Sequence, residues 1–249
     1  MFSLKLIEPK VLNGSIGVIS DFITEATFSI QKEGIKLVAM DPANISMVVL
    51  DILPSAFTEF RVDEPVEITV NLESLKNALK RAKPTDSLAL TLDKNKLKLT
   101  ISGKSKKRFF IPLLEREVKE RKVPALDFMA NVELDASEFK DFVDDVSIAG
   151  DAVTFDADKN LFGMSAGDAG SKVNIELTRG HDALVQIATS SEAVRSIYSV
   201  DYLKKMARAS GLADSVSIRF ANNYPLRLDF RALNKLQMSF ILAPRIENK

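Results

Sequence analysis

Few side chains in this sequence could carry out catalysis or bind a metal. It has no cysteine and a single histidine, which excludes thiol nucleophiles, iron–sulfur clusters and zinc sites built from thiolates. The histidine, His181, lies in the polar stretch T-R-G-H-D, which is typical of a surface loop. Carboxylates are plentiful, but no pair of them is marked as a general acid and base. We therefore expect no catalytic residue, no metal site and no cofactor.

Two short motifs resemble ligand-binding loops but lack their essential residues. Asp156, Asp158 and Asn160 have the spacing with which an EF-hand calcium loop begins, yet no glutamate follows at the twelfth position. Residues 163–170 are rich in glycine but lack the lysine of a phosphate-binding P-loop. The first stretch is more typical of a turn. An enzyme that uses only carboxylates, lysines and a metal ion remains an alternative, which a turnover assay would reveal.

Length and composition are those of a globular protein. The chain has 249 residues, of which 46% are apolar and 27% charged, enough for one large domain or two of ordinary size. No apolar run could span a bilayer and the N-terminus lacks the pattern of a signal peptide, so we expect a cytoplasmic protein. The 34 basic and 34 acidic side chains give a net charge of zero, whereas proteins that hold nucleic acid by affinity alone are usually basic.

The sequence is internally duplicated. At an offset of 127, residues 19–28 align with residues 146–155, and at an offset of 128, residues 75–88 align with residues 203–216. Two windows that agree on nearly one offset indicate two homologous halves. A charged stretch that ends at a proline separates them, as is typical of an exposed linker. We predict an N-terminal domain at 1–114, a connecting loop at 115–127 and a C-terminal domain at 128–249.

Each half has the same predicted elements. In the first half, alternation over residues 2–6 predicts a strand, and apolar residues at helical spacing predict a helix over 11–22. Residues 27–38 have the pattern of a hairpin, and a second helix is expected from 73 to 82. The second half repeats this order, with helices near 137–146 and 201–209. We therefore predict an α+β fold of two repeated domains, each with antiparallel sheets and helices on one face.

Two segments carry a resemblance to a known family. Residues 34–50, G-I-K-L-V-A-M-D-P-A-N-I-S-M-V-V-L, resemble the signature of the proliferating cell nuclear antigen family of DNA sliding clamps. Residues 241–247, I-L-A-P-R-I-E, resemble the C-terminal segment of that family. Residues 224–226 and 138–153 also fall in register, and the sequence is most similar to archaeal members of the family.

The resemblance implies a polymerase processivity factor with the DNA clamp fold and no catalytic activity. It implies a trimeric ring whose helices line a hole around double-stranded DNA. The ring would bind DNA without sequence specificity, and the protein would be associated with the nucleoid. The implied partners are a clamp loader and, through short hydrophobic motifs, DNA polymerase, flap endonuclease and DNA ligase, with no membrane. Two alternatives remain: a clamp-like scaffold that binds proteins without encircling DNA, and one subunit of a heterotrimeric clamp.

The second helix of each half is the expected DNA-facing surface. Lys76 and Lys80 are four residues apart and share a face, as do Lys204 and Arg208, although an ordinary solvated helix has the same spacing. The first helices fit less well, because the one near 137–146 carries four acidic residues that would repel phosphate. The residues expected to face DNA are Lys10, Lys76, Lys80, Arg81, Lys140, Lys204, Lys205 and Arg208.

The two halves differ in charge. Residues 1–124 carry 20 basic and 16 acidic side chains and residues 125–249 carry 14 and 18, so their formal charges are +4 and −4. A head-to-tail ring would bring these opposite charges together, and we expect a homotrimer. The family pairs the edge strands at 106–113 and 172–178 across the subunit contact. The expected interface residues are Arg81, Lys83, Lys106, Lys107, Arg108, Phe109, Phe110, Glu138, Asp141, Asp144, Asp145, Lys172, Val173, Ile175 and Leu177.

The resemblance also places a hydrophobic groove for partner peptides under the connecting loop. Its expected lining residues are Met40, Asn44, Ile45, Val123, Pro124, Pro225, Leu242, Ala243, Pro244, Arg245 and Ile246. From the sequence alone, Met40 and Ile45 fit a buried core equally well. Pro244 interrupts regular structure and would leave the C-terminal stretch irregular and free to contact a ligand.

Overall fold

The computed structural model describes residues 1–115, 121–167 and 170–246 and divides into two compact units. Unit 1 comprises Met1–Pro42, Val48–Val123 and Leu233–Met238. Unit 2 comprises Ala43–Met47, Pro124–Ala232 and Ser239–Lys249. Unit 1 is therefore built mainly from the first half of the chain and unit 2 mainly from the second.

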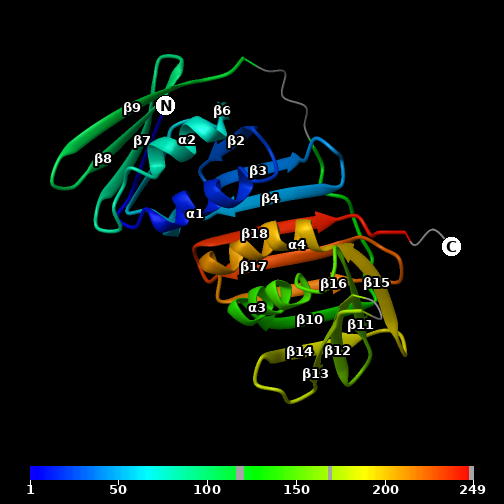
Figure 1. Cartoon of the computed structure of the whole chain (residues 1–249). Helices are drawn as coiled ribbons and strands as arrows, with labels where there is room; N and C mark the ends of the chain where they lie inside the picture. Colours follow the sequence, from blue (N-terminus) through cyan, green and yellow to red (C-terminus); the bar gives the residue numbers. More distant parts are fainter. Residues whose placement is uncertain (116–120, 168–169, 247–249) are drawn as a thin grey trace. The chain divides into compact units, whose positions relative to one another are not determined.

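The described part of unit 1 contains helices and groups of antiparallel strands (Figure 1). One group has the order β5-β1-β7-β8-β9, and in the other β4, β3, β2 and β6 follow one another. The elements, of which β4 belongs to this unit from Val48 onward, are β1 (Phe2–Leu6), α1 (Lys10–Ile19), β2 (Glu25–Gln31), β3 (Gly34–Met40), β4 (Ser46–Ile52), the 3₁₀ turn η1 (Pro54–Ala56), β5 (Glu59–Val62), β6 (Val66–Asn71), α2 (Leu72–Leu79), β7 (Ser87–Asp93), β8 (Lys96–Ser102) and β9 (Lys106–Pro112).

Unit 2 is built from the same kinds of element, helices and groups of antiparallel strands (Figure 1). Its strands have the orders β14-β10-β16-β17-β18 and β13-β12-β11-β15. The elements, of which β18 belongs to this unit from Ser239 onward, are β10 (Ala130–Asp135), α3 (Ala136–Val146), β11 (Ala152–Ala157), β12 (Leu161–Gly167), β13 (Lys172–Thr178), β14 (Leu184–Thr189), β15 (Val194–Ser199), α4 (Val200–Ala207), η2 (Arg208–Leu212), β16 (Ser215–Phe220), β17 (Leu226–Ala232) and β18 (Leu236–Leu242).

The two units are topological copies of each other. Adding nine to every strand number of unit 1 gives the strand orders of unit 2. The helices also pair in the same way, with α1 beside α2 and α3 beside α4 (Figure 1). The structure therefore confirms both the predicted duplication and the predicted α+β class.

The helices are amphipathic and bury one stripe against the sheets of their own unit. In α2, Leu72, Leu75 and Leu79 are buried, at the three- and four-residue spacing that defines one helix face. In unit 2 the core also contains aromatic contacts, such as that between Phe155 and Tyr198, whose ring centroids are 5.4 Å apart. This burial fixes which helix faces remain exposed to solvent.

The predicted elements differ from the observed ones mainly at their ends. We expected the first helix to continue to residue 22, but α1 ends at Ile19. The amides of Asp21 and Phe22 donate to the carbonyls three residues earlier, at 3.1 and 3.0 Å, so the chain tightens into a 3₁₀-like turn there. Strand β5 and the turn η1 had no signal in the sequence pattern.

Candidate functional site

In unit 1, one of the predicted DNA-facing lysines is held against the neighbouring helix. Lys76 of α2 donates a hydrogen bond from Nζ to Oγ of Ser20, the C-cap of α1, at 2.8 Å. The same Nζ lies 3.8 Å from the carboxylate of Asp21, and the Lys76 side chain is only 22% exposed. The charge of Lys76 is therefore largely balanced within the unit, whereas Lys80 and Arg81 at the end of α2 are exposed.

In unit 2, the helix pair repeats this contact with a different neighbour. Lys204 of α4 donates from Nζ to Oγ of Ser147, the C-cap of α3, at 3.3 Å. The next residue is Ile148, which is 78% exposed, so no carboxylate stands where unit 1 has its aspartate. Lys204, Lys205 and Arg208 are all exposed, which leaves α4 and the following turn a cationic surface.

Helix α3 presents a mainly acidic surface. Lys140 forms an ion pair with Asp144 one turn later, with 2.6 Å between Nζ and Oδ2. This hydrogen bond, together with the negative charge of Asp144, raises the pKa of Lys140. Glu138, Asp141 and Asp145 on the same helix are also exposed. Lys140 is thus less available to phosphate than the lysines of α4, whereas Lys10 at the start of α1 is exposed on a helix without acidic residues.

Strands β9 and β13 lie at the ends of their strand orders among the described residues. On β9, Phe110 is 47% exposed, and the Nζ of Lys98 lies 5.9 Å from its ring centroid. On β13, Val173 and Ile175 are half-buried, while Leu177 is buried in the core of its own unit. Edge strands have unpaired main-chain groups to which another strand can add. The other expected interface residues on these strands or near α2 are exposed (Lys83, Lys106, Arg108 and Lys172) or half-buried (Lys107 and Phe109).

The C-terminal segment of unit 2 follows β18 without regular secondary structure. The amide of Ala243 donates to the carbonyl of Ile45 at 3.0 Å, so the segment lies beside the short stretch 43–47. The amide of Arg245 donates to the carbonyl of Ile197 in β15 at 2.7 Å. Leu242 is buried, while Ile45 is 40% and Ile246 is 83% exposed. This arrangement combines apolar side chains at the surface with an irregular backbone.

A second predicted wall of the groove, the loop before β17, is attached to the same strand β15. The hydroxyl of Tyr198 donates to the carbonyl of Tyr224 at 2.8 Å, directly before Pro225. The amide of Asn223 donates to the carbonyl of Arg195 at 3.3 Å. Burial raises the pKa of the Tyr198 hydroxyl, which therefore stays protonated and remains a donor. Strand β15 thus holds both the loop and the C-terminal segment.

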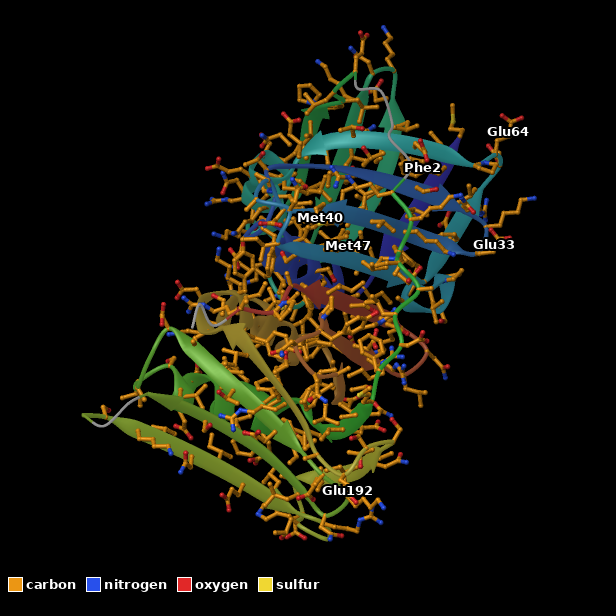
Figure 2. The ribbon with its side chains drawn as sticks, turned by 90° about the vertical axis from the view of Figure 1, so that its right-hand side faces the viewer. Phe2, Glu33, Met40, Met47, Glu64 and Glu192 are labelled. Atoms are coloured by element: carbon orange, nitrogen blue, oxygen red, sulfur yellow. The ribbon has the colours of Figure 1, made fainter. Side chains whose placement is uncertain are left out.

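The remaining predicted groove residues come from several segments. Met40 is half-buried at the end of β3, away from the turn that contains Glu33 (Figure 2). Val123, Pro124 and Asn44 are exposed. Asn44 has a positive φ of 57°, a left-handed conformation that asparagine tolerates better than most residues. Neither Met40 nor Ile45 belongs to the fully buried core.

Sequence reasoning missed the main buried charge of unit 2. Asp229 of β17 is fully buried and accepts hydrogen bonds from Ser239 at 2.6 Å, from Arg227 at 3.0 Å and from Arg219. Burial opposes its ionisation, but the hydrogen bonds from Ser239 and Arg219 and the charges of both arginines hold its pKa below the ordinary value. The sequence signal was the alternation of charged and apolar residues in this strand, where Asp229 lies two residues from Arg227 and two from Arg231.

Features of other functional classes are not found in the part of the chain that the structure describes. No three of its histidine, aspartate and glutamate residues are grouped so that they could hold a metal ion. No helix among these residues is long and apolar enough to cross a membrane.

Comparison with known proteins gives matches along nearly the whole chain. Models of the N-terminal and C-terminal domains of proliferating cell nuclear antigen match residues 1–118 and 122–245. The DNA polymerase sliding clamp of Nanoarchaeum equitans is 40% identical over 243 residues, which cover 96% of this chain and 97% of that protein. The DNA polymerase sliding clamp of Thermococcus fumicolans is 37% identical over 234 residues, 94% of each chain.

Two solved structures have the same fold. One is proliferating cell nuclear antigen from Thermococcus kodakaraensis, with a TM-score of 0.92 and 27% identity over 98% of this chain and 100% of that one. The other is a complex of PCNA2 and PCNA3 from Sulfolobus tokodaii, with a TM-score of 0.91 and 26% identity over 98% and 100%.

Proposed function

The chain belongs to the proliferating cell nuclear antigen family of DNA sliding clamps, and we propose that three copies close into a ring around double-stranded DNA. A sliding clamp is a processivity factor and not a catalyst. In this role the protein keeps replication and repair enzymes on the DNA without itself changing it. Three parts of the chain would share this work: the edge strands, the DNA-facing helices and the partner groove.

The repeated helix pair is the observation that carries the DNA-encircling role. In both units, a lysine of the second helix contacts the C-cap serine of the first, at 2.8 Å in unit 1 and 3.3 Å in unit 2. A ring of three copies would repeat these cationic helix ends around the duplex. Contacts to phosphate carry no sequence information and are compatible with sliding.

Enclosure explains how a chain of zero net charge can serve DNA. A closed ring leaves the duplex only by opening or by sliding off an end, so tight binding is unnecessary. The inner surface needs only to avoid repelling phosphate. The acidic surface of α3 would be tolerated best if it lay at the subunit contact, opposite basic residues such as Lys83 and Arg108.

Ring closure would use the edge strands β9 and β13, one from each of two neighbouring copies. The formal charges of +4 and −4 on the two halves of the chain favour contact between copies of this same chain. We therefore propose a homotrimer. Native mass spectrometry at micromolar concentration should show it. A monomer alone would favour a heterotrimer, the kind of assembly suggested by the Sulfolobus tokodaii complex of PCNA2 with PCNA3.

Retention on circular DNA tests the enclosing role. The protein, loaded by an ATP-dependent clamp loader, should stay with a nicked circular plasmid during gel filtration at high salt. Cutting the circle once should release it. If the protein dissociates equally from circular and linear DNA, it acts as a scaffold that does not enclose the duplex.

Partner binding would use the exposed apolar residues beside the C-terminal segment. We propose that a short hydrophobic motif of DNA polymerase, flap endonuclease or DNA ligase docks there. Changing Ile45, which is 40% exposed, to glutamate should abolish stimulation of the polymerase while the trimer remains. The matched control is Leu53→Glu, because Leu53 is similarly exposed at 42% but lies in unit 1. Equal loss in both variants would contradict the groove assignment.

A further inference from the structure

The C-terminal segment that forms one wall of the proposed groove is fastened by a side chain as well as by its backbone. Nη1 of Arg245 lies 3.0 Å from the carbonyl oxygen of Asp151 and 2.9 Å from its carboxylate oxygen Oδ2. One guanidinium nitrogen thus contacts both the main chain and the side chain of a residue far away in the sequence. All of these atoms belong to unit 2.

Asp151 is itself well placed to act as an anchor. It directly precedes β11, and its carbonyl oxygen also accepts a hydrogen bond at 3.0 Å from the amide of Val200, the first residue of α4. Its backbone is therefore held between a strand and a helix of the core. The side chain of Asp151 is 80% exposed and that of Arg245 is 44% exposed. The carboxylate therefore lies at the surface, within reach of the guanidinium.

The side-chain anchor adds to the main-chain hydrogen bonds that the segment makes through the amides of Ala243 and Arg245. Pro244 has no amide hydrogen, and residues 243–246 belong to no strand or helix. Ile246 at the end of the described chain is 83% exposed. If the segment were loose, a bound peptide would have to order it, and that ordering would reduce the affinity.

We propose that Arg245 and Asp151 form a latch that holds residues 243–246 ready to receive the partner peptide. Arg245 is then a positioning residue, which acts through the backbone of this segment and does not itself contact the ligand. The inference rests on the proposed partner groove. It adds Asp151 to the residues on which peptide binding depends.

A different role for Arg245 makes the opposite prediction for Asp151. If Arg245 bound an acidic residue of the ligand directly, removing Asp151 would free its charge, and the affinity would be unchanged or would rise. If the two residues form a latch, removing either one loosens the same segment. The double variant then loses no more than a single variant, because both act on one interaction.

The test measures binding of a fluorescently labelled peptide that carries the hydrophobic motif of a partner polymerase to the intact trimer. Arg245→Ala and Asp151→Ala should each weaken binding about twofold to fivefold, which is the range of a partly exposed ion pair. Arg245→Lys should restore part of the affinity, since lysine still reaches the carboxylate. Asp156→Ala is the matched control, because Asp156 forms another surface ion pair of unit 2, with Arg195 at 3.7 Å; it should bind as the unchanged protein does.

The inference is overturned if Asp151→Ala binds as tightly as the unchanged protein or more tightly, or if Arg245→Ala has no effect. It is also overturned if Arg245→Ala lowers the melting temperature but weakens peptide binding no more than Asp156→Ala does. The variant Ile45→Glu distinguishes failure of the latch proposal from failure of the groove assignment itself. If that variant also binds the peptide normally, the proposed groove is wrong, whereas its loss of binding leaves the groove in place and tests the latch alone.

Discussion

The helix pairs of the two units have the same geometry and different charges. In both, a lysine reaches the serine that caps the neighbouring helix, but in unit 1 the next residue is Asp21 and in unit 2 it is Ile148. Lys76 is therefore balanced by a carboxylate, whereas Lys204 remains exposed. Within the helix pair of unit 2, acidic residues are concentrated on α3, while α1 has none.

The strands show the same divergence. Asp229 pairs with Ser217 across β16 and β17, and the matching position across β7 and β8 of unit 1 is Thr100, opposite Ala89. Unit 2 thus buries a carboxylate between two arginines where unit 1 has a half-buried threonine. The duplicated fold retains its topology and apolar core, and equivalent positions have acquired different electrostatic roles.

The largest expected difference between the units concerns this buried carboxylate. Asp229→Asn should lower the free energy of unfolding of unit 2 by about 3 kcal/mol, because it leaves two partly buried guanidinium groups without a counter-charge. Thr100→Ala in unit 1 should cost less than about 1 kcal/mol. Thermal unfolding followed by calorimetry measures both. Equal effects would show that Asp229 is no more important than its counterpart.

The same carboxylate should make unit 2 sensitive to acid. Because the pKa of Asp229 is lower in the folded state than in the unfolded chain, its contribution is complete above the ordinary pKa and is lost as the pH falls through the folded value. The melting temperature should therefore fall as the pH drops below about 4, and Asp229→Asn should flatten that dependence. An unchanged pH profile in the variant would contradict the assignment.

A smaller difference is expected at the starts of α2 and α4. The Oδ1 of Asn71 accepts a hydrogen bond from the amide of Ser74 at 2.9 Å, whereas Ser199, at the same position of α4, makes no side-chain cap. Asn71→Ala should therefore destabilise the protein by about 1 kcal/mol and Ser199→Ala by only a few tenths. Chemical denaturation resolves the two. A larger loss for Ser199→Ala would mean that its hydroxyl has another role.

The smallest effects concern the charges on the helices that we propose face DNA. Asp21→Asn should release Lys76 and lengthen retention on circular DNA, whereas Ile148→Asp should give Lys204 the neighbour found in unit 1 and shorten retention. Each change should stay below about fivefold, because these charges are partly exposed. The salt dependence of retention supplies the check, since its slope follows the number of phosphates that the protein neutralises. If both variants changed retention in the same direction, the comparison between the helix pairs would be wrong.

The sequence predicted what depends on local pattern. The stripe of Leu72, Leu75 and Leu79 indicated α2, and the two matching offsets indicated the repeated domains, because periodicity and duplication are visible in the residues themselves. The prediction that the C-terminal motif forms a groove wall rests only on its family resemblance. The assignment of individual site residues remains a prediction.

The sequence could not predict what depends on how distant elements meet. That Lys76 is balanced by Asp21 follows from the packing of α2 beside α1, and neither residue signals it alone. Asp229 finds its partners on two other strands, and Arg245 finds Asp151 before β11. Such interactions join residues whose spacing in the chain carries no pattern.

The backbone of the C-terminal segment also limits what it can bind. Between Ala243 and Arg245, the two amides are already used and the proline between them has none. The main chain of this stretch can therefore only accept further hydrogen bonds, through its carbonyl oxygens. A peptide bound here would have to donate the main-chain hydrogen bonds, and a proline at the facing position would lack the N–H group for one of them.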